Sequence, residues 1–392
     1  MHALTPPTDS AHVTWIENEQ TRQALWCAEN NSAAPRRVVV ADDTLSADSA
    51  YRLVSQGTSL LWRGDYHNAR QLLQALTRRI DKKKKTRTDT AELSPHDAFN
   101  LYRLHQSQRA QVLNKLLIQL DSDGTMALRR APDVREAVHA ALGDIQEPLL
   151  LSLRALQGMV GAHEWRKKGV AIPALGASIH VHYGVFSPNR GEYIDLVAQA
   201  PLPATSLALD IGTGSGVLAA VLAKRGIAKV IATEQDPRAL ACARENIGRL
   251  GLEHRVDIRQ DNMFPPETSL LVVCNPPWLP AKPTVPLERA IYDPESSMLL
   301  SFLNGLAKHL QPGGQGWLIM SDLAEHLGLR SPEFLTDAIA SAGLRVLGKL
   351  DARPRHGKAT DPSDPLHMAR RAETTSLWRL THADAAIRAN SH

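Results

Sequence analysis

The chain has 392 residues with a formal net charge of +4, and 43% of them are hydrophobic and 22% charged. This composition excludes wholesale disorder, and the length predicts two or three domains. No apolar stretch approaches the ~20 residues of a membrane span, and the N-terminus lacks the regions of a secretory signal. Cys27, Cys242 and Cys274 are too few and too scattered for a disulfide framework or a zinc site. We therefore expect a cytoplasmic protein with no metal and no membrane partner.

Residues 1–160 are predicted to form a mainly helical domain that recognises the substrate. Apolar residues recur there at helical spacing. Ser94 is a typical N-cap, followed by a proline in the first turn, and Gly143 is a typical helix end. The predicted helical segments are residues 50–80, with a break around Gly64-Asp65, residues 94–120 and residues 133–142.

A run of positive charge interrupts this helical region. It comprises Arg78, Arg79, Lys82, Lys83, Lys84, Lys85 and Arg87, opposed only by Asp81. Such a run could bind phosphates, with an affinity that falls as salt rises. The alternative, which is the ordinary one for a run of charges, is a solvated loop.

Residues 161–195 are predicted to form a bridging hairpin around Pro173 and Gly176 and a segment that leads into the next domain. Over residues 196–392, strands alternate with helices, which is typical of an α/β, doubly wound and mostly parallel sheet. No long helix separates the last two strands, so they are expected to form an antiparallel hairpin. The seven predicted strands are residues 207–210, 229–233, 255–259, 270–274, 316–320, 345–350 and 376–380.

The first of these strands runs into the sequence Asp-Ile-Gly-Thr-Gly-Ser-Gly, residues 210–216. Glycines allow a sharp turn and a close approach of the backbone to a ligand. A dinucleotide fingerprint would need a glycine where Val217 stands, and no Gly-Lys-Ser/Thr of a P-loop follows. Asp210, at the end of the strand, would attract an ammonium group and repel a pyrophosphate. A glycine turn capped by an aspartate, with no ligand, is the alternative.

Two further acids follow the next strands. Glu234 comes 24 residues after Asp210, where a carboxylate can accept both hydroxyls of a ribose. Asp261 follows the third strand, where it could accept a hydrogen bond from an adenine amino group. Each alone is an ordinary polar residue at a strand end, but their joint placement favours a nucleoside ligand.

Residues 210–216 resemble the first motif of the S-adenosylmethionine-dependent methyltransferases with a seven-stranded Rossmann-like fold. The resemblance extends over residues 206–380 and does not cover residues 1–150. It implies S-adenosyl-L-methionine as the cofactor. The residues implied to bind it are Gly212, Thr213, Gly214 and Gly216 beneath the methionine part, Asp210 near its amino group, Glu234 at the ribose, Asp261 at the adenine, and Asn275.

The fourth strand is followed by Asn275, Pro276, Pro277 and Trp278. The prolines donate no N–H and cannot continue a sheet, so backbone carbonyls and the Asn275 side-chain oxygen are left to accept hydrogen bonds. An aromatic ring beside them can stack on a planar group. The segment resembles the Asn-Pro-Pro-aromatic motif of enzymes that methylate amino groups of bases or the amide of glutamine. Tyrosine or phenylalanine is commoner there than tryptophan, and the resemblance implies that these four residues are catalytic.

Two weaker features flank the motifs. Pro188, Arg190 and Glu192 resemble a segment of the release factor glutamine methyltransferases, which implies that Arg190 and Glu192 close over the cofactor. A polar helix start is the alternative. A second loop could form a basic rim near the substrate through Arg353, Arg355, His356 and Lys358.

The sequence thus predicts an N-methyltransferase with a partner in the translation apparatus. The lysines at 82–85 favour RNA, most plausibly ribosomal RNA, as the acceptor. The segment at 279–283 is instead more similar to the glutamine-modifying group, so glutamine of a translation protein is the alternative. A small amine acceptor stays open, and a catalytically silent cofactor-binding protein is disfavoured because the motifs are intact. The sequence does not indicate the oligomeric state.

Overall fold

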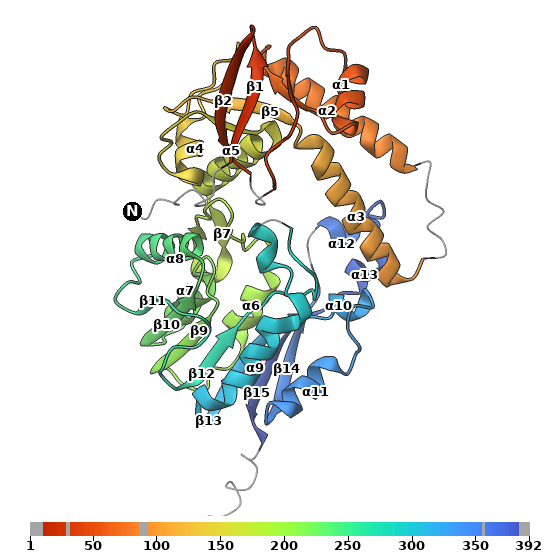
Figure 1. Ribbon diagram of the computed structural model, residues 1–392. Helices are drawn as coiled ribbons and strands as arrows, with labels where there is room; N and C mark the ends of the chain where they lie inside the picture. The colour runs from red at the N-terminus through yellow and green to blue at the C-terminus, as the bar shows by residue number, and fades with distance from the viewer. Residues whose placement is uncertain (1–10, 29–31, 86–92, 285, 355–356, 384–392) are drawn as a thin grey trace, which may run out of the picture. The chain divides into compact units, whose positions relative to one another are not determined.

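The computed structural model describes residues 11–28, 32–85, 93–284, 286–354 and 357–383. Its chain divides into two compact units (Figure 1). The first comprises Met1–Leu93 and Asn100–Glu164, and the second Ser94–Phe99 and Trp165–His392. None of the described helices combines the length and the hydropathy that a bilayer-spanning segment requires.

The first unit contains a six-stranded sheet in the order β1-β2-β6-β5-β4-β3. Strands β3, β4 and β5 are parallel, whereas β6 is antiparallel to β5 and β1 is antiparallel to β2. The strands are β1 (His12–Glu17), β2 (Gln20–Trp26), β3 (Val38–Ala41), β4 (Ser59–Trp62), β5 (Leu116–Leu120) and β6 (Leu149–Ser152). The helices are α1 (Ala47–Ser55), α2 (Tyr66–Lys85), α3 (Pro95–Leu113), α4 (Arg135–Leu142) and α5 (Leu153–Lys168).

Helices make up more of this region than strands, as predicted, but the sheet was not anticipated. Leu60 and Leu61 lie in β4 instead of in a helix, and the helix that starts after Ser94 ends at Leu113 instead of Leu120. All four residues of β4 are buried. A short apolar strand that is buried on both faces lacks the alternation of a half-exposed strand, so its leucines also match a helical pattern. The predicted helix over 133–142 is confirmed as α4.

In the second unit, β7 (Val170–Ile172) and β8 (Ala177–Ile179) form a two-stranded antiparallel hairpin, which confirms the hairpin predicted around Pro173 and Gly176. A short 3-10 turn, η1 (Pro173–Leu175), joins the two strands, and Gly176 ends it in the left-handed region with φ 62°. Helix α6 (Glu192–Gln199) follows and leads into the main sheet.

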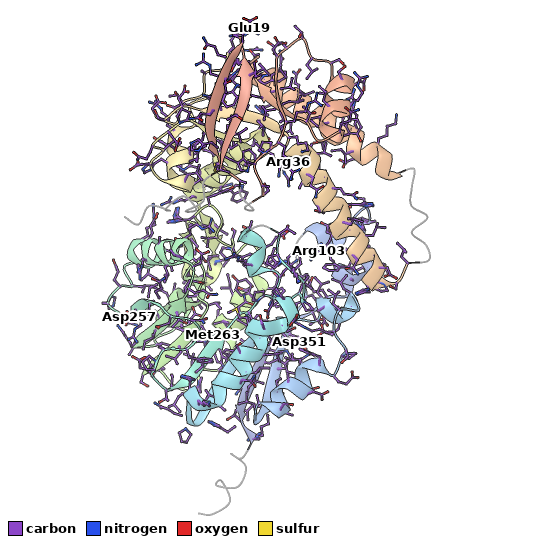
Figure 2. All side chains as sticks on the ribbon, in the orientation of Figure 1. Glu19, Arg36, Arg103, Asp257, Met263 and Asp351 are labelled. Carbon is purple, nitrogen blue, oxygen red and sulfur yellow. The ribbon has the colours of Figure 1, made fainter. Side chains whose placement is uncertain are left out.

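The main sheet has seven strands in the order β11-β10-β9-β12-β13-β15-β14. All neighbours are parallel except β15, which is antiparallel to both β13 and β14, so the predicted closing hairpin is confirmed. Figure 2 shows Asp257 and Asp351 on the two edge strands. The strands are β9 (Leu207–Ile211), β10 (Lys229–Glu234), β11 (Val256–Gln260), β12 (Ser269–Cys274), β13 (Leu310–Ser321), β14 (Leu344–Ala352) and β15 (Thr375–His382).

Helices separate most consecutive strands of this sheet. Asp236 caps the second helix of the sheet region by accepting hydrogen bonds from the N–H groups of Arg238 and Ala239, at 2.8 and 3.4 Å. The helices are α7 (Val217–Lys224), α8 (Pro237–Arg249), α9 (Ser297–His309), α10 (Leu323–His326), α11 (Phe334–Ser341), α12 (Gly357–Thr360) and α13 (His367–Ala372). Two 3-10 turns, η2 (Pro286–Ala290) and η3 (Pro294–Ser296), precede α9.

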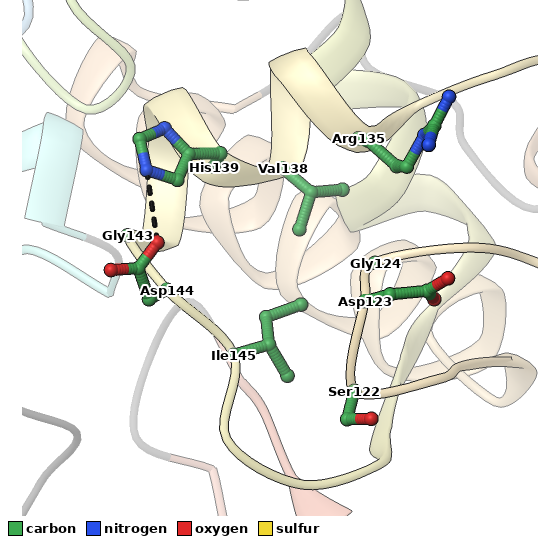
Figure 3. A pocket seen from close by; sticks show the side chains of 9 residues that line it. All are labelled: Ser122, Asp123, Gly124, Arg135, Val138, His139, Gly143, Asp144 and Ile145. Carbon is green, nitrogen blue, oxygen red and sulfur yellow. Dashed lines mark ion pairs between the residues drawn. The ribbon is translucent and has the colours of Figure 1, made fainter.

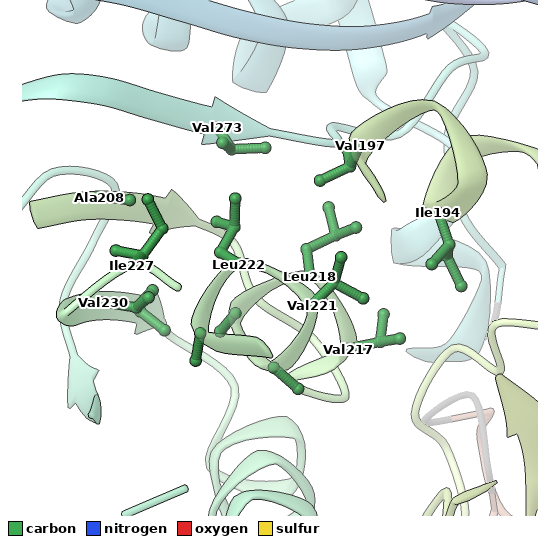
Figure 4. Packing of buried hydrophobic residues seen from close by; sticks show 14 of the residues in the cluster. Ile194, Val197, Ala208, Val217, Leu218, Val221, Leu222, Ile227, Val230 and Val273 are labelled. Carbon is green, nitrogen blue, oxygen red and sulfur yellow. The ribbon is translucent and has the colours of Figure 1, made fainter. Parts of the chain in front are cut away.

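Hydrophobic clusters cover both faces of this sheet. On one face, α6 and α7 pack on Ala208, Val230 and Val273, as Figure 4 shows. On the other face, α9 and α11 pack on residues that alternate with these, such as Leu209 and Val272. Successive residues of a strand point to opposite faces, so a strand covered on both sides is apolar throughout. This burial explains the apolar run of a central strand such as β12, whereas the edge strands β11 and β14 also carry exposed or half-buried charged residues.

Candidate functional site

Four parallel strands end side by side at one edge of the main sheet. In the pairing of β9 with β12, Ile211 lies opposite Cys274, so the loops that start at Gly212 and Asn275 leave the sheet next to each other. On the other side of β9, Ile211 lies opposite Thr233, which places Glu234 one residue further along at the same edge. Open α/β sheets bind ligands at the carboxyl ends of their strands.

Asp210 is a buried acid at this edge, with 1% of its surface exposed. Thr213 donates a hydrogen bond from Oγ1 to Asp210 Oδ2 at 2.6 Å, which favours the charged form. Burial outweighs this hydrogen bond and, with the nearby charge of Glu234, raises the pKa of Asp210 to about 6. A cationic ligand group beside this carboxylate would lower its pKa again and favour the ionised form.

The glycine loop between β9 and α7 has three residues in the left-handed region, with φ of 71° at Gly212, 57° at Gly214 and 82° at Gly216. A Cβ on Gly212 would lie 2.8 Å from Met298 Cε, and one on Gly216 would lie 3.3 Å from Ala243. A Cβ on Gly214 would have nothing within 4 Å. A Cβ at Gly212 would displace the flexible end of Met298 and one at Gly216 would press against α8, whereas Gly214 borders open space.

Glu234 ties the end of β10 to this loop. Its Oε2 accepts a hydrogen bond from the Gly214 N–H at 3.1 Å, and its Oε1 accepts from the N–H groups of Gln235 and Asp236 at 2.8 and 2.9 Å. Each carboxylate oxygen has two lone pairs, so the group retains acceptor capacity for a ligand hydroxyl. Asp261 directly follows β11, and no partner for its carboxylate occurs among the described residues.

Sequence reasoning missed Asn246, which supports the loop from helix α8. It is 1% exposed, and its Nδ2 donates to the Ser215 carbonyl at 3.1 Å. Its Oδ1 accepts from the His180 N–H at 2.7 Å. An asparagine inside an amphipathic helix carries no motif, so only its burial and its partners reveal this role.

The Asn-Pro-Pro-Trp segment leaves β12 beside the glycine loop. Pro276 and Pro277 are buried, and Asn275 and Trp278 are half-buried. The Trp278 indole Nε1 donates a hydrogen bond to Asn275 Oδ1 at 3.0 Å. A carbonyl oxygen accepts two hydrogen bonds, so one acceptor position of this amide is taken by the indole and one is left for a ligand.

Arg190 and Glu192 differ from each other in their surroundings. Arg190 donates to Glu373 at 3.0 Å and lies over the Trp278 ring, with 5.8 Å from its guanidinium carbon to the ring centroid. Glu192 is 4% exposed in the first turn of α6, and its Oε1 is buried without a hydrogen bond among the described residues. Glu373, remote in sequence, was not anticipated at this edge.

The basic run that starts at Arg78 lies on the last turns of α2 up to residue 85, so this part is helical and not a loop. Arg78 and Lys82 are exposed. Within the run, Asp81 pairs with Arg109 at 3.2 Å. Arg353 donates to the Ala372 carbonyl at 3.1 Å. Residues 87, 355 and 356 and the side chains at 83–85 and 358 lie outside the described part of the chain.

A surface pocket of about 300 Å³ lies in the first unit, apart from these motifs (Figure 3). His139 and Asp144 on its wall form an ion pair at 3.1 Å. None of the predicted site residues lines it. Across the described ranges, no group of three or more His, Cys, Asp or Glu side chains is arranged to hold a metal ion.

The seven-stranded sheet and the two loops at its edge agree with the fold expected from the sequence. Residues 176–335, which contain both loops, match the family model of the methyltransferase small domain. S-adenosylmethionine is the cofactor that the family indicates.

Three curated relatives illustrate the range of the similarity. The chain is 31% identical over 188 residues to a release factor glutamine methyltransferase from Cereibacter sphaeroides, covering 44% of this chain and 66% of that protein. It is 31% identical over 146 residues to a ribosomal protein L11 methyltransferase from Symbiobacterium thermophilum, covering 36% and 39%. It is 29% identical over 155 residues to a tRNA1(Val) (adenine(37)-N6)-methyltransferase from Bacteroides thetaiotaomicron, covering 38% and 65%. The chain thus spans about two thirds or less of each relative.

Proposed function

We propose that the protein is an S-adenosylmethionine-dependent N-methyltransferase whose acceptor is a planar amino group of RNA, with ribosomal RNA favoured. The observation that carries this proposal is the pairing of β9 with β12, which starts the glycine loop and the Asn275 loop at adjacent strand ends. The translation-related names of the three relatives support an acceptor in the translation apparatus. The proposed place of action is therefore the cytoplasm, and the proposed role of residues 1–160 is substrate recognition.

The strand-end residues fit the cofactor. The buried carboxylate of Asp210 suits the ammonium group of its methionine part, and the open space at Gly214 leaves room for a ligand over the loop. Glu234 and Asp261 offer acceptors for the ribose hydroxyls and the adenine amino group. When bound, the cofactor supplies a methyl group on a positively charged sulfonium, which is already electrophilic. The residues proposed to hold it are Asp210, Gly212, Thr213, Gly214, Gly216, Glu234, Asp261 and Asn275.

Asn275 and its neighbours are proposed to orient the acceptor. The remaining acceptor position on Asn275 Oδ1 and the Pro276 carbonyl would each take one N–H of the –NH2 group. These hydrogen bonds direct the nitrogen lone pair toward the methyl group and stabilise the positive charge that develops on nitrogen. The Trp278 ring would stack on the planar acceptor. The excess proton leaves after the transfer, so no strong base is required.

Glutamine of a translation protein is the second candidate acceptor. The observation that favours it is the 31% identity to a release factor glutamine methyltransferase. A side-chain amide presents the same two N–H donors and the same planar face as a base amino group. The four-residue motif therefore accommodates either acceptor.

The proposal is tested by labelling an extract from cells that lack this gene. Purified full-length protein is incubated with the extract and S-adenosylmethionine that carries a radioactive methyl group, and the label is separated into RNA and protein. Label in RNA is the expected result, and mass spectrometry then locates the base. Label in one protein band would indicate that glutamine of that protein, and not RNA, is the acceptor. Label in neither fraction, despite cofactor binding, would contradict both acceptors.

A further inference from the structure

Arg190 connects three parts of the second unit that are far apart in sequence. It precedes α6, and its guanidinium lies 5.8 Å from the centroid of the Trp278 ring. On its other side it donates to Glu373 Oε1 at 3.0 Å. The same oxygen accepts the hydroxyl of Ser321 at 2.7 Å, at the end of β13. A single arginine thus links the ends of β12 and β13 to the start of β15.

The carboxylate in this network is fully buried, with 0% of the Glu373 side chain exposed. A charge in such a place is stable only when it is paired and hydrogen-bonded. Arg190 and Ser321 meet these conditions at Oε1 of Glu373. The ion pair restrains the guanidinium in the ligand-free protein, because breaking a buried ion pair is costly.

The indole that Arg190 covers also orients Asn275. Trp278 Nε1 donates to Asn275 Oδ1 at 3.0 Å, so the position of the ring decides which way the amide points. A phenylalanine or tyrosine ring has no donor at this place. The tryptophan in this motif consequently adds a connection between the aromatic ring and the amide.

We infer that Arg190 is a positioning residue for methyl transfer: anchored by Glu373, it holds the Trp278 ring and, through the indole N–H, the Asn275 side chain. This inference rests on the proposed function. It assigns Arg190 to the acceptor side of the site, whereas the sequence resemblance implies that it closes over the cofactor. Lysine cannot reproduce the arrangement, because a planar guanidinium can stack on an indole and donate to a carboxylate at the same time, and a lysine ammonium is a point charge.

The test uses the full-length protein labelled with 5-fluorotryptophan, whose fluorine resonance for Trp278 is assigned as the signal missing in W278F. In Arg190→Gln, we expect this resonance to shift and broaden, while the Kd of S-adenosylhomocysteine changes by no more than about twofold. With the acceptor identified by the labelling experiment, kcat should fall by about tenfold or more, because small misplacements of a positioned group are costly. Arg190→Lys should be intermediate, and Glu373→Gln should also move the resonance.

The matched control is Arg225→Lys. Arg225 lies 5.9 Å from the centroid of the Trp317 ring and donates to the carbonyls of Val197 and Ala200, so it is a second arginine–indole pair in the same unit. We expect it to lower stability and leave kcat unchanged. An equal loss of kcat in both variants would show a general packing effect and overturn the inference.

Two further outcomes also overturn it: an unmoved Trp278 resonance with unchanged kcat in Arg190→Gln, or a loss of S-adenosylhomocysteine affinity that accounts for the whole defect. The second outcome would return Arg190 to the cofactor side. Absence of transfer by the unmodified protein to any acceptor contradicts the proposed function instead. In that case the fluorine resonance still decides whether Arg190 holds the ring.

Discussion

Asp210 lies at the end of β9 with 1% of its surface exposed and a pKa raised to about 6 by burial. In the unfolded chain the pKa of the same group returns to its ordinary value of about 3.9. Below pH 4 the carboxyl is protonated in both states, and burial carries no electrostatic cost. As pH rises through 6, the folded protein must hold a buried charge, and stability decreases.

The first prediction concerns how the free energy of unfolding changes with pH. Between pH 4 and pH 7, the free energy of unfolding of the ligand-free protein should fall by about 2 kcal/mol relative to that of Asp210→Asn, because each pKa unit corresponds to ~1.4 kcal/mol. The measurement is chemical denaturation of both proteins at several pH values. Parallel pH profiles for the two proteins would contradict a raised pKa at Asp210.

The same residue gives a second prediction for the cofactor. S-adenosylhomocysteine carries the same ammonium group, so its affinity should increase as pH rises toward 6 and then level off, because the carboxylate that attracts the ammonium becomes ionised. Asp210→Asn and Asp210→Ala should bind weakly with little dependence on pH. Calorimetric titration between pH 5 and pH 8 measures the affinity of the unmodified protein and of the two variants at each pH. A pH dependence retained in Asp210→Asn would assign the effect to another group.

Asn275 provides the third prediction, for turnover. Asn275→Ala should change the Kd of S-adenosylhomocysteine by no more than about twofold, because seven other residues are also proposed to hold the cofactor. It should reduce kcat by about 100-fold, because it removes an acceptor that stabilises charge in the transition state. Single-turnover methylation of the identified acceptor checks the rate, and calorimetry checks the binding. Full activity in this variant would remove Asn275 from the chemistry.

At the scale of elements, the glycine loop between β9 and α7 gives the fourth prediction. Gly214→Ala and Gly226→Ala both place a side chain at positive φ, 57° and 99°, with nothing within 4 Å of the new Cβ. Each should lose about 1 kcal/mol of stability from backbone strain. Only Gly214→Ala should also weaken the binding of S-adenosylhomocysteine, because the new Cβ projects into the open space of the loop. Equal affinities in the two variants would show that the ligand lies elsewhere.

The elements of the second unit were predictable because their signals are local. Central strands such as β9 and β12 contain apolar runs, and helix α8 has an ordinary cap in Asp236. In the first unit, β4 and β5 are short leucine-rich strands whose pattern does not differ from that of a buried helix turn. Their pairing partners lie far away in the sequence, for example Leu60 with Leu116. The six-stranded sheet could therefore be recognised only from the pairing of its strands in the tertiary structure.

At the scale of the whole molecule, the basic end of α2 is the candidate contact surface for the RNA substrate. If residues 82–85 bind the RNA substrate, replacing all four lysines by alanine should reduce the slope of log affinity against log salt by up to about 0.7 for each lost contact to a single strand. Arg36→Ala with Arg37→Ala is the control, since it removes exposed charge elsewhere in the same unit. Filter binding of the labelled RNA over a range of salt gives both slopes. An unchanged slope would remove α2 from the recognition surface.

The sequence by itself determined the two loops of the site. The backbone of each loop depends on single residue types: Gly214 adopts a positive φ, and Pro276 and Pro277 have no N–H group to donate. Such features can be read directly from the sequence. The tertiary structure decided which loops meet, because the order of strands places β12 next to β9 although another two strands lie between them in the sequence. It also brought Arg190 to Glu373, 183 residues away, and to Trp278. A contact between residues so far apart leaves no local pattern, since each side chain alone is an ordinary surface charge until burial pairs them.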